Sequence, residues 1–247
     1  MNGEHIWLTH LDASEGDEYV KILQELGYRY SLQPLLRIQY QDFSDWGVSA
    51  AQILASKALA ITSPRAVRAI QTLIQQNAEF RDHLRALPAY CISGKSLETA
   101  RQAGLAVREC GAKSSLELAG FLGSQQLESP LLFPCSFERR DDLPDLLRSL
   151  GLEVLEARSY RTLELELESA QELRERIGKD KPSYIVLFSP SGVRALVKLF
   201  ERSFFDDIKL IAIGATSAAE LSKHELVCQA VCEAPNAQAL KEALFLR

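Results

Sequence analysis

The chain has 247 residues, of which 47% are hydrophobic and 25% are charged, and its formal net charge is −5. This length allows one large domain or two of roughly 120 residues each. The acidic balance excludes a broad basic surface for nucleic acid, but a local positive pocket can still bind a small anion. No apolar run reaches about 18 residues, so we expect no membrane span.

Short apolar runs alternate with amphipathic stretches along almost the whole chain. We expect strands within residues 5–9, 28–36, 58–62, 89–93, 106–110, 130–134, 153–160, 183–188, 208–214 and 226–232. We expect helices over stretches that include 19–26, 66–74, 97–103, 143–150, 193–200 and 237–245. Such alternation predicts parallel sheets covered by helices on both faces. Because one sheet of all these strands would be unusually wide, we expect two sheets of about five strands each.

Two strand-to-helix junctions occur twice. The segments "AITSPRAVRAI" (60–70) and "LFSPSGVRALV" (187–197) both pass from apolar residues through Ser-Pro into a helix-like pattern. The segments "CISGKSLETARQAGL" (91–105) and "AIGATSAAELSKHEL" (212–226) both pass through a turn of small residues into a helix, in the same order. This repetition predicts two halves of similar architecture.

The Ser-Pro pairs predict the first turns of two helices. A serine can cap the first turn with its hydroxyl, and proline suits the next position because no amide is lost there. Good capping explains one such junction by itself. Four junctions indicate a site, because ligands of parallel sheets bind outside the carboxyl ends of the strands, where helix amino termini favour anions. We therefore expect a large ligand with several negative charges.

Six segments in order resemble the uroporphyrinogen-III synthase family: "TSPRAV", "SGKSLETA", "LLFPCSFERRDDLPDLLRSLG", "YRT", "LFSPSGV" and "AIGATSAAEL". The resemblance implies an α/β fold of two doubly wound, flavodoxin-like parallel-sheet domains, joined by a two-stranded linker with a cleft between them. One domain would combine 1–34 with 164–247, the other would be 38–160, and the linkers would lie at about 34–38 and 158–164. The repeats alone favour a cut in the middle of the chain.

The resemblance also implies an enzyme of the hydro-lyase type, without a cofactor, in haem biosynthesis. Its substrate would be hydroxymethylbilane, a linear tetrapyrrole with many carboxylates, which loses its terminal hydroxyl and closes through a spiro intermediate with ring D inverted. The same substrate closes unaided without inversion, so catalysis would depend on positioning. The competing hypothesis is a non-catalytic two-domain module that binds an anionic small molecule, because a fold does not dictate a function.

Candidate residues of the first half follow from the motifs that match the family. The resemblance assigns substrate binding to Thr62, Ser63 and Arg65, although Arg65 can equally be a solvated helix residue. Ser96 falls where the family often has threonine, but Ser93 stands where it has glycine, which leaves the role of this junction open.

The resemblance implies two further candidates, Arg140 after the "FPC" turn and Tyr160 beside the linker. Arg140 either reaches the substrate or pairs with Asp141 or Glu138. Tyr160 is the candidate catalytic residue, because a phenol can hydrogen-bond the departing hydroxyl, although phenols titrate near pH 10 and are weak acids. The alternative for Tyr160 is a packing residue beside the linker.

The second half repeats the anion-binding pattern. Ser189 and Ser191 belong to the second Ser-Pro junction, and Gly214, Thr216 and Ser217 form the fourth junction. The glycine permits a close backbone approach, and the two hydroxyls can cap the helix or contact substrate. His10 is either a carboxylate contact or an exposed loop residue.

Three other patterns in the sequence resemble functional motifs but do not indicate a site. "SGKS" (93–96) lacks the glycine that a phosphate-binding loop needs at position 89, where Ala89 stands. His224, Cys228 and Cys232 fall on a strand and loop, so we expect no metal site. The five cysteines form no CxxC pair, and the N-terminus lacks a signal-peptide pattern, so we expect reduced thiols in the cytoplasm. We expect a monomer that binds a small molecule and no nucleic acid.

Overall fold

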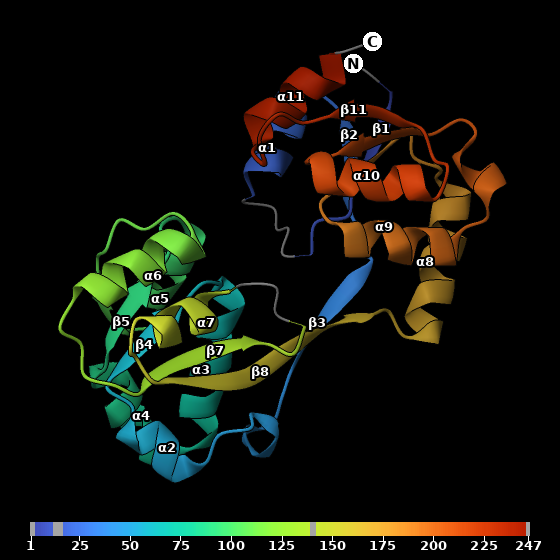
Figure 1. Cartoon of the computed structure of the whole chain (residues 1–247). Helices are drawn as coiled ribbons and strands as arrows, with labels where there is room; N and C mark the ends of the chain where they lie inside the picture. The colour runs from blue at the N-terminus through green and yellow to red at the C-terminus, as the bar shows by residue number, and fades with distance from the viewer. Residues whose placement is uncertain (1–2, 12–16, 139–141, 246–247) are drawn as a thin grey trace. The chain divides into compact units, whose positions relative to one another are not determined.

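The computed structural model describes residues 3–11, 17–138 and 142–245, which form two compact units. Unit 1 comprises Met1–Arg37 with Leu163–Arg247, and unit 2 comprises Ile38–Thr162. Each unit has a sheet of its own, and in unit 1 the blue N-terminal elements lie among the orange and red C-terminal ones (Figure 1).

Unit 1 is built on a five-stranded sheet in the order β11-β10-β9-β1-β2, with all neighbours parallel. The chain winds one way from β1 to β2 and the other way from β9 to β11, so the order reverses between β1 and β9. The strands are β1 (His5–Leu8), β2 (Arg29–Leu32), β9 (Tyr184–Leu187), β10 (Lys209–Ala212) and β11 (Cys228–Val231). The helices are α1 (Glu18–Glu25), α8 (Leu167–Lys179), α9 (Pro190–Leu199), α10 (Ala215–Lys223), α11 (Ala237–Phe245) and the 3-10 turn η2 (Arg202–Phe205).

Both faces of this sheet are buried. On β1, Ile6 and Leu8 face the cluster that α1 and α11 cover, and Trp7 faces the cluster that α8, α9 and α10 cover. Successive side chains of a strand point to opposite faces, so a strand that is apolar throughout fits a sheet with helices on both sides.

Unit 2 is built on a six-stranded sheet in the order β3-β8-β7-β4-β5-β6, parallel from β8 to β6. Here the order reverses between β4 and β7. The strands are β3 (Leu36–Tyr40), β4 (Ala58–Ile61), β5 (Pro88–Cys91), β6 (Ala106–Arg108), β7 (Leu131–Ser136) and β8 (Val154–Glu164). The helices are α2 (Ala50–Ala55), α3 (Pro64–Gln76), α4 (Ala78–Ala86), α5 (Lys95–Gln102), α6 (Ser115–Ser124), α7 (Leu143–Ser149) and the 3-10 turn η1 (Phe43–Asp45).

The parallel sheets and alternating helices confirm the predicted fold class, but one expected strand was wrong. Residues 28–36 were expected as a single strand, whereas β2 ends at Leu32 and β3 begins at Leu36 in the other sheet. Pro34 has no amide for a ladder bond. The carbonyl of Gln33 accepts from Nε1 of Trp7 at 2.7 Å, which holds the chain at the break.

Candidate functional site

The reversal point of the unit 1 sheet lies at the carboxyl ends of β1 and β9. Thr9 follows β1, and its hydroxyl donates to the carbonyl oxygen of Val186 at 2.8 Å. The ring of His10 stacks on Phe188 with centroids 4.6 Å apart, and Tyr19 meets Phe188 edge-on at 5.0 Å. In parallel sheets this is where ligands bind, so the structure places His10 at a ligand-binding position.

Charged and polar groups surround this aromatic cluster. Nδ1 of His10 lies 3.5 Å from Oδ2 of Asp17, and Asp17 also caps α1 by accepting from the amide of Tyr19 at 2.9 Å. Burial, with the charges of Glu18 and Asp17, raises the pKa of Tyr19 above its usual value. The Tyr19 phenol therefore stays protonated. Sequence reasoning missed Thr9, Asp17 and Tyr19, although Asp17 before an apolar periodic stretch is a typical N-cap signal.

The predicted Ser-Pro helix starts are confirmed in both units. Ser189 caps α9 by accepting from the amide of Gly192 at 3.1 Å, and its hydroxyl lies 3.1 Å from that of Ser191. Ser63 caps α3 by accepting from the amide of Arg65 at 3.2 Å. A Cβ at position 192 would lie 3.3 Å from the Ser189 hydroxyl, so glycine leaves room for the cap.

The other two junctions begin helices without a side-chain cap. Gly214 precedes α10 and Gly94 precedes α5, and in neither helix does the N-cap residue bond to a first-turn amide through a side chain. Thr216 is exposed, whereas Ser217 and Ser96 are only 2% and 4% exposed. The expected cap from Thr216 or Ser217 is therefore not formed. The Ser217 amide donates to the Gly214 carbonyl at 3.1 Å, so in α10 the amides before it are the ones that water or an anion can bind.

Gly94 explains how unit 2 departs from the family pattern. Its φ of 82° lies in the left-handed region, where a side chain is strained. The left-handed residue of this turn is therefore Gly94, one position after Ser93, where the resemblance predicts the glycine. Ser93 instead fixes the turn through its amide, which donates to the carbonyl of Ala112 at 2.7 Å.

Tyr160 lies at the carboxyl edge of the unit 2 sheet. Ser136, the last residue of β7, is its register partner, and the Tyr160 carbonyl accepts from the amide of Phe137 at 3.0 Å. Tyr160 as a whole is 7% exposed and packs in the cluster of α3 and α4, and its ring centroid lies 6.5 Å from that of Tyr40. The hydroxyl of Ser136 donates to Glu138 at 3.0 Å. Arg140 and Asp141 lie outside the described residues.

Within each unit the candidate residues gather at one edge. In unit 2 the strands β7, β4 and β5 are neighbours, so their carboxyl ends bring together Ser136, Ser63 and Gly94. In unit 1 the strands β1, β9 and β10 are neighbours, so theirs bring together His10 and Ser189 with Gly214. Both edges can bind anions through helix amino termini.

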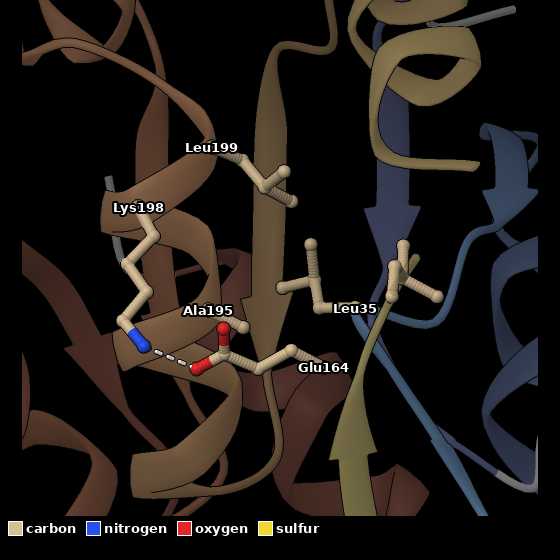
Figure 2. Close-up of a pocket in the computed structure, with 6 residues that line it drawn as sticks. Leu35, Glu164, Ala195, Lys198 and Leu199 are labelled. Carbon is tan, nitrogen blue, oxygen red and sulfur yellow. Dashed lines mark hydrogen bonds and ion pairs between the residues drawn. The ribbon is translucent and has the colours of Figure 1, made fainter. Parts of the chain in front are cut away.

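A small pocket in unit 1 has a different character. Its volume is about 40 Å³, and it lies between Leu35, the end of β8 and the last turns of α9. Figure 2 shows Lys198 of α9 pointing to the carboxylate of Glu164, with which it forms an ion pair. Leu35, only 1% exposed, packs in the same apolar cluster as α9. A pocket of this size has no room for a tetrapyrrole and instead marks where the flanking segments pack on α9.

Two further observations concern the described part of the chain. His, Cys, Asp and Glu side chains there form no group of three or more that could hold a metal ion. None of its helices combines the length and the apolar character that crossing a membrane requires.

Comparisons with known proteins cover nearly the whole chain. The family model described as uroporphyrinogen-III synthase HemD matches residues 17–242. The crystal structure of uroporphyrinogen-III synthetase from Helicobacter pylori is similar with a TM-score of 0.71 and 21% identity, covering 99% of this chain and 100% of that one. A mutant uroporphyrinogen III synthase from Thermus thermophilus is similar with a TM-score of 0.56 and 17% identity, covering 98% and 99%. These likenesses show the fold.

Proposed function

The chain belongs to the uroporphyrinogen-III synthase family, and from this premise we propose how its residues act in haem biosynthesis. The substrate is hydroxymethylbilane, and the product is uroporphyrinogen III, with the last ring inverted as the macrocycle closes. The family match over residues 17–242 does not favour a non-catalytic binding module.

The observation that carries the proposal is the matched set of helix starts. Among the helices that begin at the four repeated junctions, α3 and α9 are each capped by their own serine, and α5 and α10 each follow a glycine without a side-chain cap. All four begin at carboxyl ends of parallel strands. A polycarboxylate suits such ends because the amides donate hydrogen bonds and the helix dipole adds positive potential. Substrate contacts are thus proposed at Thr62, Ser63, Arg65, Ser96, Arg140, Ser189, Ser191, Gly214, Thr216 and Ser217.

Tyr160 is proposed as the catalytic group. Its phenol would hydrogen-bond the hydroxyl that leaves as water, after which the delocalised cation is attacked by ring D. Packing against Tyr40 and the bond from the Phe137 amide to its carbonyl fix its position, as catalysis by positioning requires.

The reaction needs only removal of water and carbon–carbon bond exchange, so we assign it to the hydro-lyase type without a cofactor. We also propose a monomer in the cytoplasm. The five cysteines, all free, favour a reducing compartment.

The test separates enzyme-directed closure from spontaneous closure. Hydroxymethylbilane is generated enzymatically, the protein is added, the products are oxidised, and the porphyrin isomers are separated. We expect the type III isomer with the protein and the type I isomer with heat-denatured protein. Only type I isomer with the native protein would refute the proposed function.

A further inference from the structure

Arg161 follows Tyr160 on β8, and its side chain is held in place by an aromatic ring. Its Cζ lies 4.1 Å from the ring centroid of Phe137, the first residue after β7. The amide of Phe137 in turn donates to the Tyr160 carbonyl. A guanidinium over an aromatic face is attracted by the ring quadrupole, so the cation has a defined orientation at the carboxyl edge of the unit 2 sheet.

This cation lacks an acidic partner in the region that the structure describes. Nε of Arg161 is shielded from solvent and makes no hydrogen bond, and none of the described acids forms an ion pair with the guanidinium. Glu138, which follows Phe137, accepts from Ser136 instead. By contrast, Arg148 in the same unit bonds to Glu156 at 2.7 Å.

Among the described residues this partly dehydrated cation has no counter-charge, so an anion that binds it lowers the free energy of the site. Removing water from a charge costs free energy, and a nearby opposite charge offsets that cost more effectively in a medium of low dielectric constant. The side chain is half-buried rather than enclosed, so an anion can reach the guanidinium. A planar guanidinium binds a carboxylate through two parallel hydrogen bonds, which a lysine cannot do.

We propose that Arg161 binds a carboxylate of the substrate and orients that part of the chain at the edge of the unit 2 sheet where Tyr160 also lies, although the two side chains leave β8 on opposite faces. This inference rests on the proposed function and adds a binding residue to it. Arg161 acts on the bound substrate rather than on the bond that breaks, so its loss weakens binding more than it slows the chemical step.

The test compares Arg161→Gln with Arg158→Gln, a matched control. Arg158 lies on the same strand but is exposed, and its backbone amide donates to the carbonyl of Trp46, a bond that the substitution keeps. We expect Arg161→Gln to raise KM about tenfold with kcat changed less than about twofold, as loss of a charge-assisted hydrogen bond implies. KM should also rise less steeply with salt than in the wild type. Arg158→Gln should leave KM and its salt dependence unchanged.

Arg161→Lys keeps the charge but loses the planar fork, so we expect a KM between those of the wild type and Arg161→Gln. If circular dichroism shows that Arg161→Gln does not fold, Arg161→Lys replaces it in the comparison with the wild type. An unchanged KM in the Arg161 variants, or an equal rise in Arg158→Gln, would overturn the inference. Either result counts against the inference only if the wild-type protein makes the type III isomer in the same assay. Loss of that isomer in the wild type would instead refute the proposed function.

Discussion

At the residue scale, the site depends on where single hydroxyl groups and charges lie. Ser63 and Ser189 use their hydroxyls to cap their own helices, at 3.2 Å and 3.1 Å from the amides they accept from. Their contribution is therefore to local helix geometry, and in the proposed function a substrate carboxylate would bind the remaining first-turn amides. Arg161 differs, because its guanidinium lies over the ring of Phe137 and does not cap a helix.

We predict that Tyr160→Phe lowers kcat by more than tenfold, because the hydrogen bond to the leaving hydroxyl is lost. Ser63→Ala is the control: it should cost about 1 kcal/mol of stability through the lost cap and lower kcat by less than about threefold, because the helix amides remain. Isomer-resolved rate assays and urea unfolding measure both effects. Full activity in Tyr160→Phe would remove its catalytic role and leave it as a packing residue.

A buried histidine gives the protein a pH-dependent stability. His5 is 7% exposed, with Nε2 3.1 Å from the hydroxyl of Ser31. Burial lowers the pKa of His5 below its usual 6.5, although Asp180, held by Arg29 at 2.6 Å, opposes this. The unfolded chain therefore binds the proton more tightly than the folded one.

We predict that the stability due to neutral His5 is fully present above about pH 6.5 and is lost as the pH falls below that value. Thermal midpoints between about pH 7.5 and pH 5.5 test this in the wild type and in His5→Gln. The variant should be less stable at neutral pH but change less over the range. An equal loss in both proteins would assign the effect to other groups.

At the element scale, α5 and α10 each begin after a glycine and not after a capping side chain. Gly94 has a φ of 82°, and a Cβ added there would meet open space, so backbone conformation and not crowding requires glycine at this position. Gly120, exposed within α6, has no such φ and also has open space.

We predict opposite effects of the same substitution at these two positions. Gly94→Ala should destabilise the protein by about 1–2 kcal/mol through left-handed strain and should raise KM by shifting the first turn of α5. Gly120→Ala should stabilise it by about 0.5–1 kcal/mol without changing KM, since alanine favours helices. Urea unfolding measures the changes in stability, and steady-state kinetics measures the changes in KM. Destabilisation by both substitutions would contradict the backbone explanation.

The sequence predicted part of this site and not the rest. Ser63, Ser189 and the glycine turns are local signals, because capping and turn chemistry involve residues within three or four positions. Arg161 carries no such signal, since its partner Phe137 follows β7, and only the register of β7 with β8 brings the two together. The cluster of His10 with Phe188 was missed for the same reason.

At the scale of the whole molecule, the chain maintains separate cores. Phe133 is fully buried in a cluster of unit 2, and Leu196 is fully buried in a cluster of unit 1. The clusters found among the described residues each stay within one unit. Units with their own cores can unfold in separate steps.

We predict that Phe133→Ala lowers the midpoint temperature of one thermal unfolding transition and that Leu196→Ala lowers the midpoint temperature of another. The first should cost about 3–5 kcal/mol and the second about 2–5 kcal/mol, because each leaves a cavity in a well-packed core. Differential scanning calorimetry should show one early transition in each variant, with the other transition at its wild-type position. A single transition shifted alike by both substitutions would refute separate unfolding.

By itself the sequence determined the strand–helix alternation, the two Ser-Pro helix starts and the resemblance to one family, because these depend on short-range periodicity, capping and ordered motifs. Only the tertiary structure decided which strands are neighbours and where the order of each sheet reverses. The physical reason is range: these features depend on pairings between residues far apart in the chain, such as β1 with β9, which no local pattern specifies.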